Sequence, residues 1–227
     1  TGGQNTALGA YAGYNQIGSH ATLIGYYAGY YATGSSNTFV GSEAGKGGTT
    51  SAPFSSGGSN TAMGYQALAG FTTGHSNIAI GYRAAKNTTT GQNNIAIGTD
   101  ALVSNTTSNS HIALGYRALY NSVNAAGNQI AIGSSALFNH SGSADDYALA
   151  LGFEAGYNSQ TDIGAVMIGY RAGYNSSGYS GVYIGSQAGQ YSTNTGIYIG
   201  RNAGLGAEKY SGGNIAIGYL SGTVFMS

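Results

Sequence analysis

Apolar and polar residues alternate in a short phrase that recurs along the whole chain. In the copy from Asn77 to Ala85 it reads polar, apolar, Ala, apolar, Gly, two surface-type residues, Ala and a small residue. Thirteen copies occur, and their central glycines are Gly9, Gly25, Gly41, Gly64, Gly81, Gly98, Gly115, Gly133, Gly152, Gly169, Gly185, Gly200 and Gly218. Apolar residues two apart have the period of a β-strand. One strand-bearing unit repeated end to end predicts an all-β protein, a parallel β-solenoid of about thirteen short coils.

The strand of each unit is apolar on both faces. We number the central glycine as position 0. Positions −3 and −1 are apolar in most copies, as in Ile95 and Ile97, and we expect them to face the inside of the coil. Position −2 points the other way and is Ala in eight copies; the others carry Leu23, Phe39, Met167, Tyr183 and Tyr198.

A strand with two apolar faces is typical of a strand that is covered on both sides. We therefore expect other copies of the chain to cover position −2, with a homotrimer as the simplest closed arrangement for a fibre. The predicted subunit-interface residues are Ala79, Ala96, Ala113, Ala131, Tyr183 and Tyr198. The alternative is that short alanines tolerate exposure beside bulky neighbours.

The central glycine is present in all thirteen units. It predicts a backbone conformation, or a close approach, that a Cβ would obstruct, so we expect it to end the strand and turn the coil. Position +3 is Ala in twelve units, which indicates that the returning segment also packs closely. Stretches rich in Asn, Ser, Thr and Gly then close each coil. Segments 46–59, which contains Pro53, and 139–146 are predicted to project as loops, and no window favours a helix.

Charge is sparse and balanced, with seven basic and seven acidic residues among 227. This argues against disorder and against a nucleic-acid partner, which would need a basic face. No apolar run approaches membrane-spanning length. Position +2 carries Arg83, Asp100 and Arg117 in successive units, and Glu154 is followed by Arg171. Because like charges on adjacent coils would repel, this alternation favours parallel coils stacked in register.

Tyrosine is the most distinctive side chain, with 20 copies. Its ring has a flat apolar face and a hydroxyl at one edge, which suits contact with sugars or with other proteins. The candidate surface contacts are the position +1 residues Tyr26, Tyr82, Tyr116, Tyr170 and Tyr219. The alternative is that the tyrosines cover the thin core or pack between subunits.

Residues with catalytic or metal-binding chemistry do not form a convincing site. The chain has no cysteine, and its four histidines fall in different units, where we interpret them as polar loop residues. The acidic residues Asp145, Asp146, Glu154 and Asp162 occupy neighbouring units and are candidates for glycosidic-bond hydrolysis, or form a solvated turn with part of the charged column. We predict no enzyme activity, no metal and no cofactor.

The repeat resembles two known kinds of fibrous protein. Asn94–Gly98 and Asn214–Gly218 are similar to the Asn-Ser-Val-Ala-Ile-Gly-type repeat of trimeric autotransporter adhesin heads, which form the YadA-like left-handed parallel β-roll. The longer pattern Gly-x-Asn-Asn-Ile-Ala-Ile-Gly-x-x-Ala-Leu is similar to repeats in phage tail fibres. The resemblance implies a left-handed solenoid and a homotrimer. The unit here is longer than the adhesin-head unit, and units one to four carry Thr at position −3.

These observations predict a single repeat domain over 1–227, which we expect to be a piece of a longer chain because it begins at Thr1. The predicted function is that of a structural and adhesive fibre, the shaft or receptor-binding part of a phage tail fibre that mediates host attachment. The alternatives are the head of a bacterial trimeric surface adhesin and a glycan-cleaving tailspike. Expected partners are further copies of the chain, a host cell-surface glycan or protein and other fibre proteins. The expected location is the virion or the cell surface.

Overall fold

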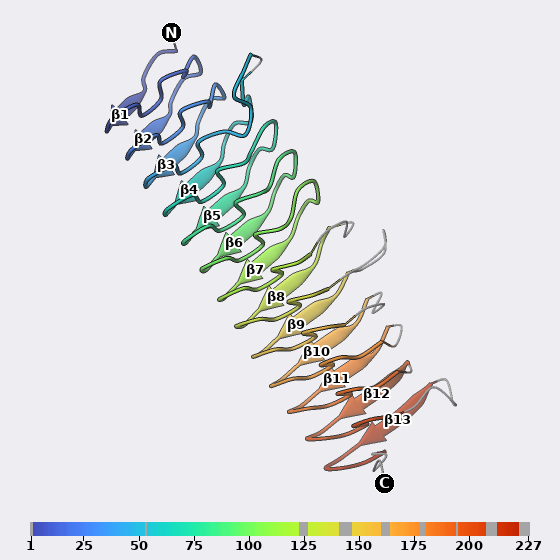
Figure 1. Ribbon diagram of the computed structural model, residues 1–227. Coiled ribbons are helices and arrows are strands. Elements are labelled where there is room, and N and C mark those ends of the chain that lie inside the picture. The colour runs from blue at the N-terminus through green and yellow to red at the C-terminus, as the bar shows by residue number, and fades with distance from the viewer. Residues whose placement is uncertain are drawn as a thin grey trace. The chain divides into compact units, whose positions relative to one another are not determined.

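The computed structural model is an all-β solenoid with one short strand in each repeat (Figure 1). It describes residues 2–52, 54–122, 127–140, 147–159, 164–177, 180–193, 195–207 and 213–222, and no helix occurs among them. All thirteen strands run parallel and lie in chain order in one sheet, which confirms the predicted fold class. The strands are β1 (Thr6–Leu8), β2 (Thr22–Ile24), β3 (Thr38–Val40), β4 (Thr61–Met63), β5 (Ile78–Ile80), β6 (Ile95–Ile97), β7 (Ile112–Leu114), β8 (Ile130–Ile132), β9 (Leu149–Leu151), β10 (Val166–Ile168), β11 (Val182–Ile184), β12 (Gly196–Ile199) and β13 (Asn214–Ile217).

The chain divides into two compact units, Thr1–Ala113 and Leu114–Ser227. Both are built from the same repeat, although the sequence predicts one repeat domain over 1–227. In a solenoid each coil contacts its neighbours and few others, so no separate core marks a domain.

Equivalent positions of neighbouring coils pair with one another. In unit 1, Ile78 pairs with Ile95, Ala79 with Ala96 and Ile80 with Ile97, and the same register holds in unit 2 between β9 and β10. The predicted parallel stacking in register is confirmed. Each position of the repeat therefore becomes a column of side chains running from coil to coil.

The orientation of the strand is the reverse of the prediction. Position −2 points into the coil, where Ala79 and Ala96 are fully buried, whereas Ile78 and Ile97 beside them are more than a third exposed. The segment after the glycine returns so close to the strand that its position +3 side chain, Ala84 in this coil, is also fully buried. The space between the two segments is narrow, so a small residue on the strand fits inside and the larger aliphatic residues face outward.

Large core side chains come from either of two facing positions. Where position −2 is large, position +4 is glycine, and a Cβ there would overlap the large side chain; these pairs are Leu23 with Gly29, Phe39 with Gly45, Met167 with Gly173, Tyr183 with Gly189 and Tyr198 with Gly204. Where position −2 is Ala, position +4 can carry the large residue, as in Ala62 with Leu68, Ala96 with Leu102 and Ala131 with Leu137, all fully buried. At this pair of facing positions each of these coils thus has one large side chain, because the space between them has room for only one.

Position −4 forms a second buried column that the sequence analysis did not identify. Asn60, Asn77 and Asn94 are buried in consecutive coils. The side-chain amide of Asn77 donates to Asn60 Oδ1 at 3.1 Å and to the Gly91 carbonyl at 2.8 Å, and its own Oδ1 accepts from the backbone N–H of Asn94 at 3.0 Å. This asparagine ladder satisfies the polar groups of a buried corner, which makes them tolerable inside the coil. In β11 and β12 the ladder is absent, and glycines at this position, Gly181 and Gly196, leave room for the Tyr183 and Tyr198 rings.

The central glycine is required for both predicted reasons. Gly81 has a φ of 130°, and a Cβ on it would lie 2.7 Å from the carbonyl oxygen of Gly98 in the next coil. Two tight turns follow: the Ala84 N–H donates to the Gly81 carbonyl, and the Lys86 N–H to the Arg83 carbonyl. The third residue of each turn, Arg83 and then Ala85, has a φ near 50°, the left-handed conformation that type II turns need.

The two predicted loops differ in what the structure describes. In segment 46–59, Gly48 donates to the Phe71 carbonyl and Ser55 to the Tyr31 carbonyl, so both ends belong to the coil and the residues between them form the excursion. Figure 1 shows this excursion between β3 and β4. Of segment 139–146, residues 141–146 lie outside the described part of the chain.

Candidate functional site

The outer face of the strands is an uncharged surface, which we call the aliphatic face. It consists of the side chains at positions −3 and −1, and these 26 positions hold only Ile, Leu, Val, Met and, at position −3 of the first four coils, Thr. Several are well exposed, including Met63 (47%), Leu151 (42%) and Ile217 (67%). The six proposed interface residues lie on the opposite side of the strand: all are buried inside their own coils, and that assignment was wrong.

The aliphatic face of each unit has the size of the largest exposed apolar patch on a typical soluble protein. Three residues at 3.3 Å each and a coil spacing of 4.8 Å give about 50 Å² per coil, or about 300 Å² for the six strands that lie wholly within each unit. Soluble monomers rarely expose contiguous apolar patches above a few hundred Å². In unit 2 the face also has a hollow of about 300 Å³, whose apolar lining includes Val182, Ile197 and Ile215. Sequence reasoning identified the columns but assigned them to the interior.

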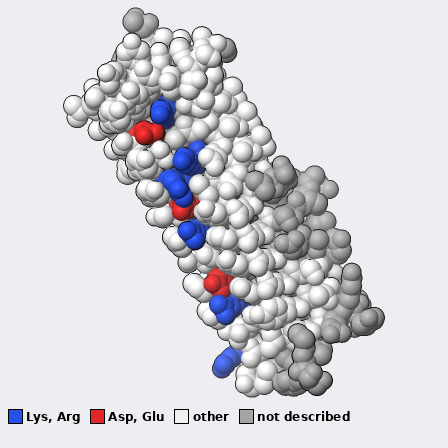
Figure 2. All heavy atoms as spheres, in the orientation of Figure 1, with Lys and Arg blue, Asp and Glu red and all other residues white. Residues whose placement is uncertain are grey.

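All the charged side chains that the structure describes lie on the opposite side of the coil, on what we call the turn edge. This edge consists of positions +1 to +6, and its charged residues are Glu43, Lys46, Arg83, Lys86, Asp100, Arg117, Glu154, Arg171 and Arg201. Figure 2 shows the charged side chains of each unit gathered in a line on its surface. Charge and exposed aliphatic surface are thus segregated.

The predicted column of alternating charge is present at the turn edge. Arg83 Nε lies 2.7 Å from Asp100 Oδ1 in unit 1, and Arg171 Nε lies 2.6 Å from Glu154 Oε2 in unit 2. The hydrogen bond with Glu154 raises the pKa of Arg171. These partly exposed pairs contribute little stability each, so their main effect is to favour the register of the coils.

The candidate tyrosines at position +1 are exposed, and two of them stack on an aromatic ring at position +1 of the neighbouring coil. Tyr26, Tyr82, Tyr116, Tyr170 and Tyr219 are 45–66% exposed. The Tyr82 ring stacks on Tyr65 with centroids 5.4 Å apart, and Tyr170 stacks on Phe153 at 5.6 Å. Stacked rings cover each other's faces, so they present mainly their edges and hydroxyls outward. For Tyr82 and Tyr170 this geometry favours hydrogen bonding over the stacking of a sugar ring on an aromatic face.

A second aromatic column lies at position +5 of unit 2. Tyr120, Phe138, Tyr157 and Tyr174 stack at centroid separations of 4.9, 4.9 and 5.3 Å. The guanidinium of Arg171 lies 5.2 Å from the rings of both Tyr170 and Tyr174, so it fills the space between the two columns. Beside this column, the amide of Asn139 donates to Asn158 Oδ1 and that of Asn158 to Asn175 Oδ1, each at 2.8 Å. The turn edge of unit 2 is consequently a well-ordered polar and aromatic surface.

The turn edge of unit 1 begins with a cluster of tyrosines. Tyr11, Tyr14, Tyr27 and Tyr30 have ring centroids 4.6 to 6.2 Å apart, and Lys46 Nζ lies 5.5 Å from the Tyr27 ring. Burial within the cluster raises the pKa of Tyr30, and burial followed by a hydrogen bond with Tyr26 raises that of Tyr27. The cluster therefore favours neutral phenols.

The histidines and acidic residues do not form a reactive site in the described part of the chain. All four histidines lie outside the strands, as interpreted from the sequence; His20 and His75 are exposed, whereas His111 and His140 are buried inside the coil. His140 Nδ1 lies 2.8 Å from Ser159 Oγ. Glu154 forms the ion pair described above, and Asp145, Asp146 and Asp162 lie outside the described residues. Within the described ranges, no three metal-binding side chains come together.

Comparisons of this chain with protein-family models, with curated proteins and with solved structures found no match. The resemblance to tail-fibre and adhesin-head repeats is therefore carried by the repeat pattern alone. Among the described residues there is also no helix with the length and apolarity needed to cross a membrane. The aliphatic face and the turn edge are the two candidate functional surfaces of the chain.

Proposed function

We propose that this chain is a structural and adhesive fibre module that assembles with copies of itself through the aliphatic face. The observation that carries the proposal is the segregation of side chains: 26 uncharged outward positions on the strands, and every described charge on the turn edge. A surface of this kind is stabilised when it is removed from water, at about 25 cal/mol for each Å² of apolar area buried.

A second copy of the chain is the partner that fits this face. Its side chains form two straight columns that repeat at every coil, as the pairings Ile78 with Ile95 and Ile80 with Ile97 illustrate. A partner must present apolar side chains at the same spacing over the same length. Another copy does so because it has the same repeat. Three copies placed around a common axis would cover all three aliphatic faces and leave the turn edges outward. The homotrimer predicted from the sequence is thus retained, with positions −3 and −1 as its interface.

Within this class, we favour the shaft or receptor-binding part of a phage tail fibre, with the head of a bacterial surface adhesin as the alternative. Both use rigid presentation and several simultaneous contacts with a cell surface, so no chemical turnover is needed. The flanking sequence separates them: a C-terminal chaperone domain would favour the fibre, and a coiled-coil stalk with a membrane anchor would favour the adhesin.

The oligomeric mass in solution tests the assembly. Three chains of 22.8 kDa give about 68 kDa by light scattering, whereas one chain gives 22.8 kDa. The double variant Ile80→Lys with Ile97→Lys places two charges on the aliphatic face and is expected to reduce the mass to that of one chain, because burying unpaired ammonium groups is costly. The matched control, Tyr82→Lys on the turn edge, is expected to keep the trimer. A wild-type chain that stays folded and monomeric at high concentration would refute the proposal.

The glycan-cleaving alternative has a separate test. Incubation with host surface polysaccharide, followed by an assay for new reducing ends, distinguishes cleavage from binding. We expect no release. Release that is lost on changing Glu154→Gln would establish an enzyme instead of a passive fibre.

A further inference from the structure

The excursion between β3 and β4 lies beside a hollow on the turn edge of unit 1. The base of the excursion is held by two contacts: the Thr49 N–H donates to Ser55 Oγ at 3.3 Å, and the Phe54 ring stacks on the Tyr31 ring of the coil with centroids 5.9 Å apart. The hollow has a volume of about 290 Å³, and its lining includes Tyr31, Thr50, Gln66 and Lys86.

The hollow exists because the fourth coil has a small residue, Ala69, at position +5. Position +5 carries Lys46 in the third coil, Ala69 in the fourth and Lys86 in the fifth, and all three line the hollow. Six of the other ten coils have Tyr or Phe at this position, as at Tyr30, and such a side chain would fill the space. The flanking lysines are two coils apart, about 10 Å at the spacing of parallel strands. That width matches one sugar ring.

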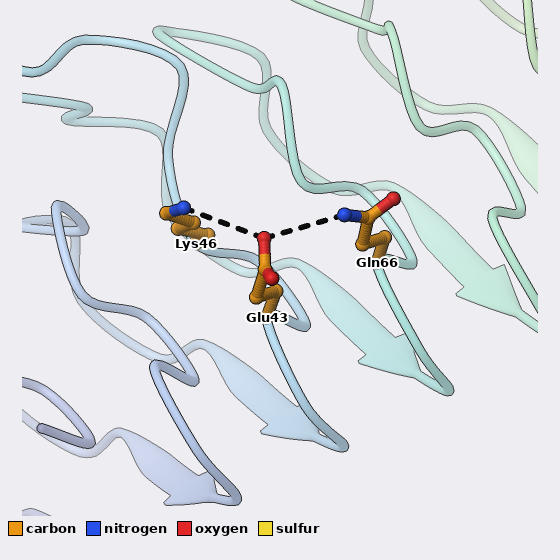
Figure 3. Close-up of polar contacts among 3 residues, drawn as sticks. All are labelled: Glu43, Lys46 and Gln66. Atoms are coloured by element: carbon orange, nitrogen blue, oxygen red, sulfur yellow. Dashed lines mark hydrogen bonds and ion pairs between the residues drawn. The ribbon is translucent and has the colours of Figure 1, made fainter. Parts of the chain in front are cut away.

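The charges around the hollow leave one positive charge unbalanced. Figure 3 shows the Glu43 carboxylate between Lys46 and Gln66; its Oε2 lies 3.3 Å from Lys46 Nζ and 3.3 Å from Gln66 Nε2. Among the described residues, no carboxylate lies within ion-pair distance of Lys86. The lining therefore combines a free ammonium group with amide and hydroxyl groups that both donate and accept hydrogen bonds.

We infer that this hollow binds a saccharide that carries a carboxylate, such as a uronic or sialic acid. The hydroxyls of a sugar require mixed donors and acceptors, which Gln66, Thr50 and Tyr31 supply, and its carboxylate matches Lys86. The inference deepens the proposed adhesive function by naming the class of receptor, and it rests on that function for its biological role. The site lies on the turn edge, so binding does not require the aliphatic face.

Titration of the wild-type chain with N-acetylneuraminic acid and with glucuronic acid, followed by amide chemical shifts, tests the inference. Shifts are expected at residues 46–50, 66–70 and 86–87. Glucose serves as the neutral-sugar probe and inorganic phosphate as the simple-anion probe. Both are expected to bind at least about tenfold more weakly, since glucose lacks the carboxylate and phosphate lacks the sugar hydroxyls.

Two variants locate the site. Ala69→Tyr fills the hollow with a residue that other coils carry at this position, so the fold is retained while binding is lost. Lys86→Gln removes one charge and is expected to weaken binding about tenfold or more, whereas Arg201→Gln, the same loss of charge in unit 2, leaves it unchanged.

Three results would each show that the hollow is not an acidic-saccharide site. Equal binding of glucose or of phosphate, unchanged binding by Ala69→Tyr, or no binding of either acidic sugar would overturn the inference. Light scattering of the Ala69→Tyr variant keeps this result separate from the proposed assembly, because its mass is expected to equal that of the wild type.

Discussion

Exchanging the large core side chain between its two positions tests the structural rule of this solenoid most directly. In the third coil Phe39 fills the interior from the strand, and Gly45 at position +4 has no room for a Cβ. In the fourth coil the strand has Ala62, and Leu68 fills the interior from the facing turn. The double variant Phe39→Ala with Gly45→Leu converts the third coil to the pattern of the fourth.

The single changes are each expected to be costly. Phe39→Ala removes a fully buried ring and leaves a cavity, at about 3 to 5 kcal/mol. Gly45→Leu alone forces a side chain into the space of the Phe39 ring, at about 1 to 3 kcal/mol or more. Gly45 also has a φ of 51°, and a side chain in that left-handed conformation costs a further ~1 kcal/mol.

Together the two changes are expected to cost far less than their sum. The leucine occupies the space that the ring leaves, and the φ of 52° at Leu68 demonstrates that the turn accepts leucine. The remaining cost is the left-handed leucine and the smaller volume, about 1 to 2 kcal/mol, so the coupling between the two sites is at least about 3 kcal/mol.

Native-state hydrogen exchange is the suitable assay, because stability in a repeat protein is local to each coil. The informative amides are Thr38, which donates to Asn60, and Gly45, which donates to Ala67. The reverse exchange in the sixth coil, Ala96→Phe with Leu102→Gly, is the matched control and should also show coupling. A double variant as unstable as the sum of its single variants would refute the idea of one shared core position.

Three further predictions concern the corners and the tyrosines. Asn77→Ala leaves the Gly91 carbonyl and the Asn94 backbone N–H without their partner, whereas Asn60 Oδ1 still accepts from the backbone N–H of residue 77. We therefore expect a loss of about 2 to 3 kcal/mol in exchange protection of neighbouring coils, while the exposed Asn93→Ala should change it by less than about 1 kcal/mol. In Gly81→Ala the new Cβ clashes with the next coil, so we expect local stability to fall by more than about 3 kcal/mol. Gly218→Ala should cost only the backbone strain, because no atom lies within 4 Å of the Cβ added there. Equal losses of stability in the two variants would contradict this reasoning. The raised pKa values of Tyr27 and Tyr30 mean that the unfolded chain loses these protons first, so their contribution to stability is complete below about pH 10 and declines as the pH rises above it. Thermal unfolding between pH 9 and 11.5 should follow this decline, and Tyr27→Phe with Tyr30→Phe should reduce its slope.

The repeat, the strand positions, the parallel register and the role of the central glycine could all be predicted from the sequence. Each depends on interactions within one unit or between equivalent residues of adjacent units. Gly81, for example, meets Gly98, and Arg83 meets Asp100. A pattern that repeats in the chain carries this information directly, because residues one period apart become neighbours in space.

Only the tertiary structure decided which face of the strand is inside. The sequence indicates that Ile78, Ala79 and Ile80 are all apolar, and hydrophobicity alone favours burying the isoleucines. The facing segment, however, returns so closely that Ala79 fits inside and Ile80 does not, and the space is filled across the coil by one large residue at either of two positions. That choice depends on the distance between two segments of the backbone, which residue types do not encode. It places the large aliphatic side chains outside, where they form the candidate interface.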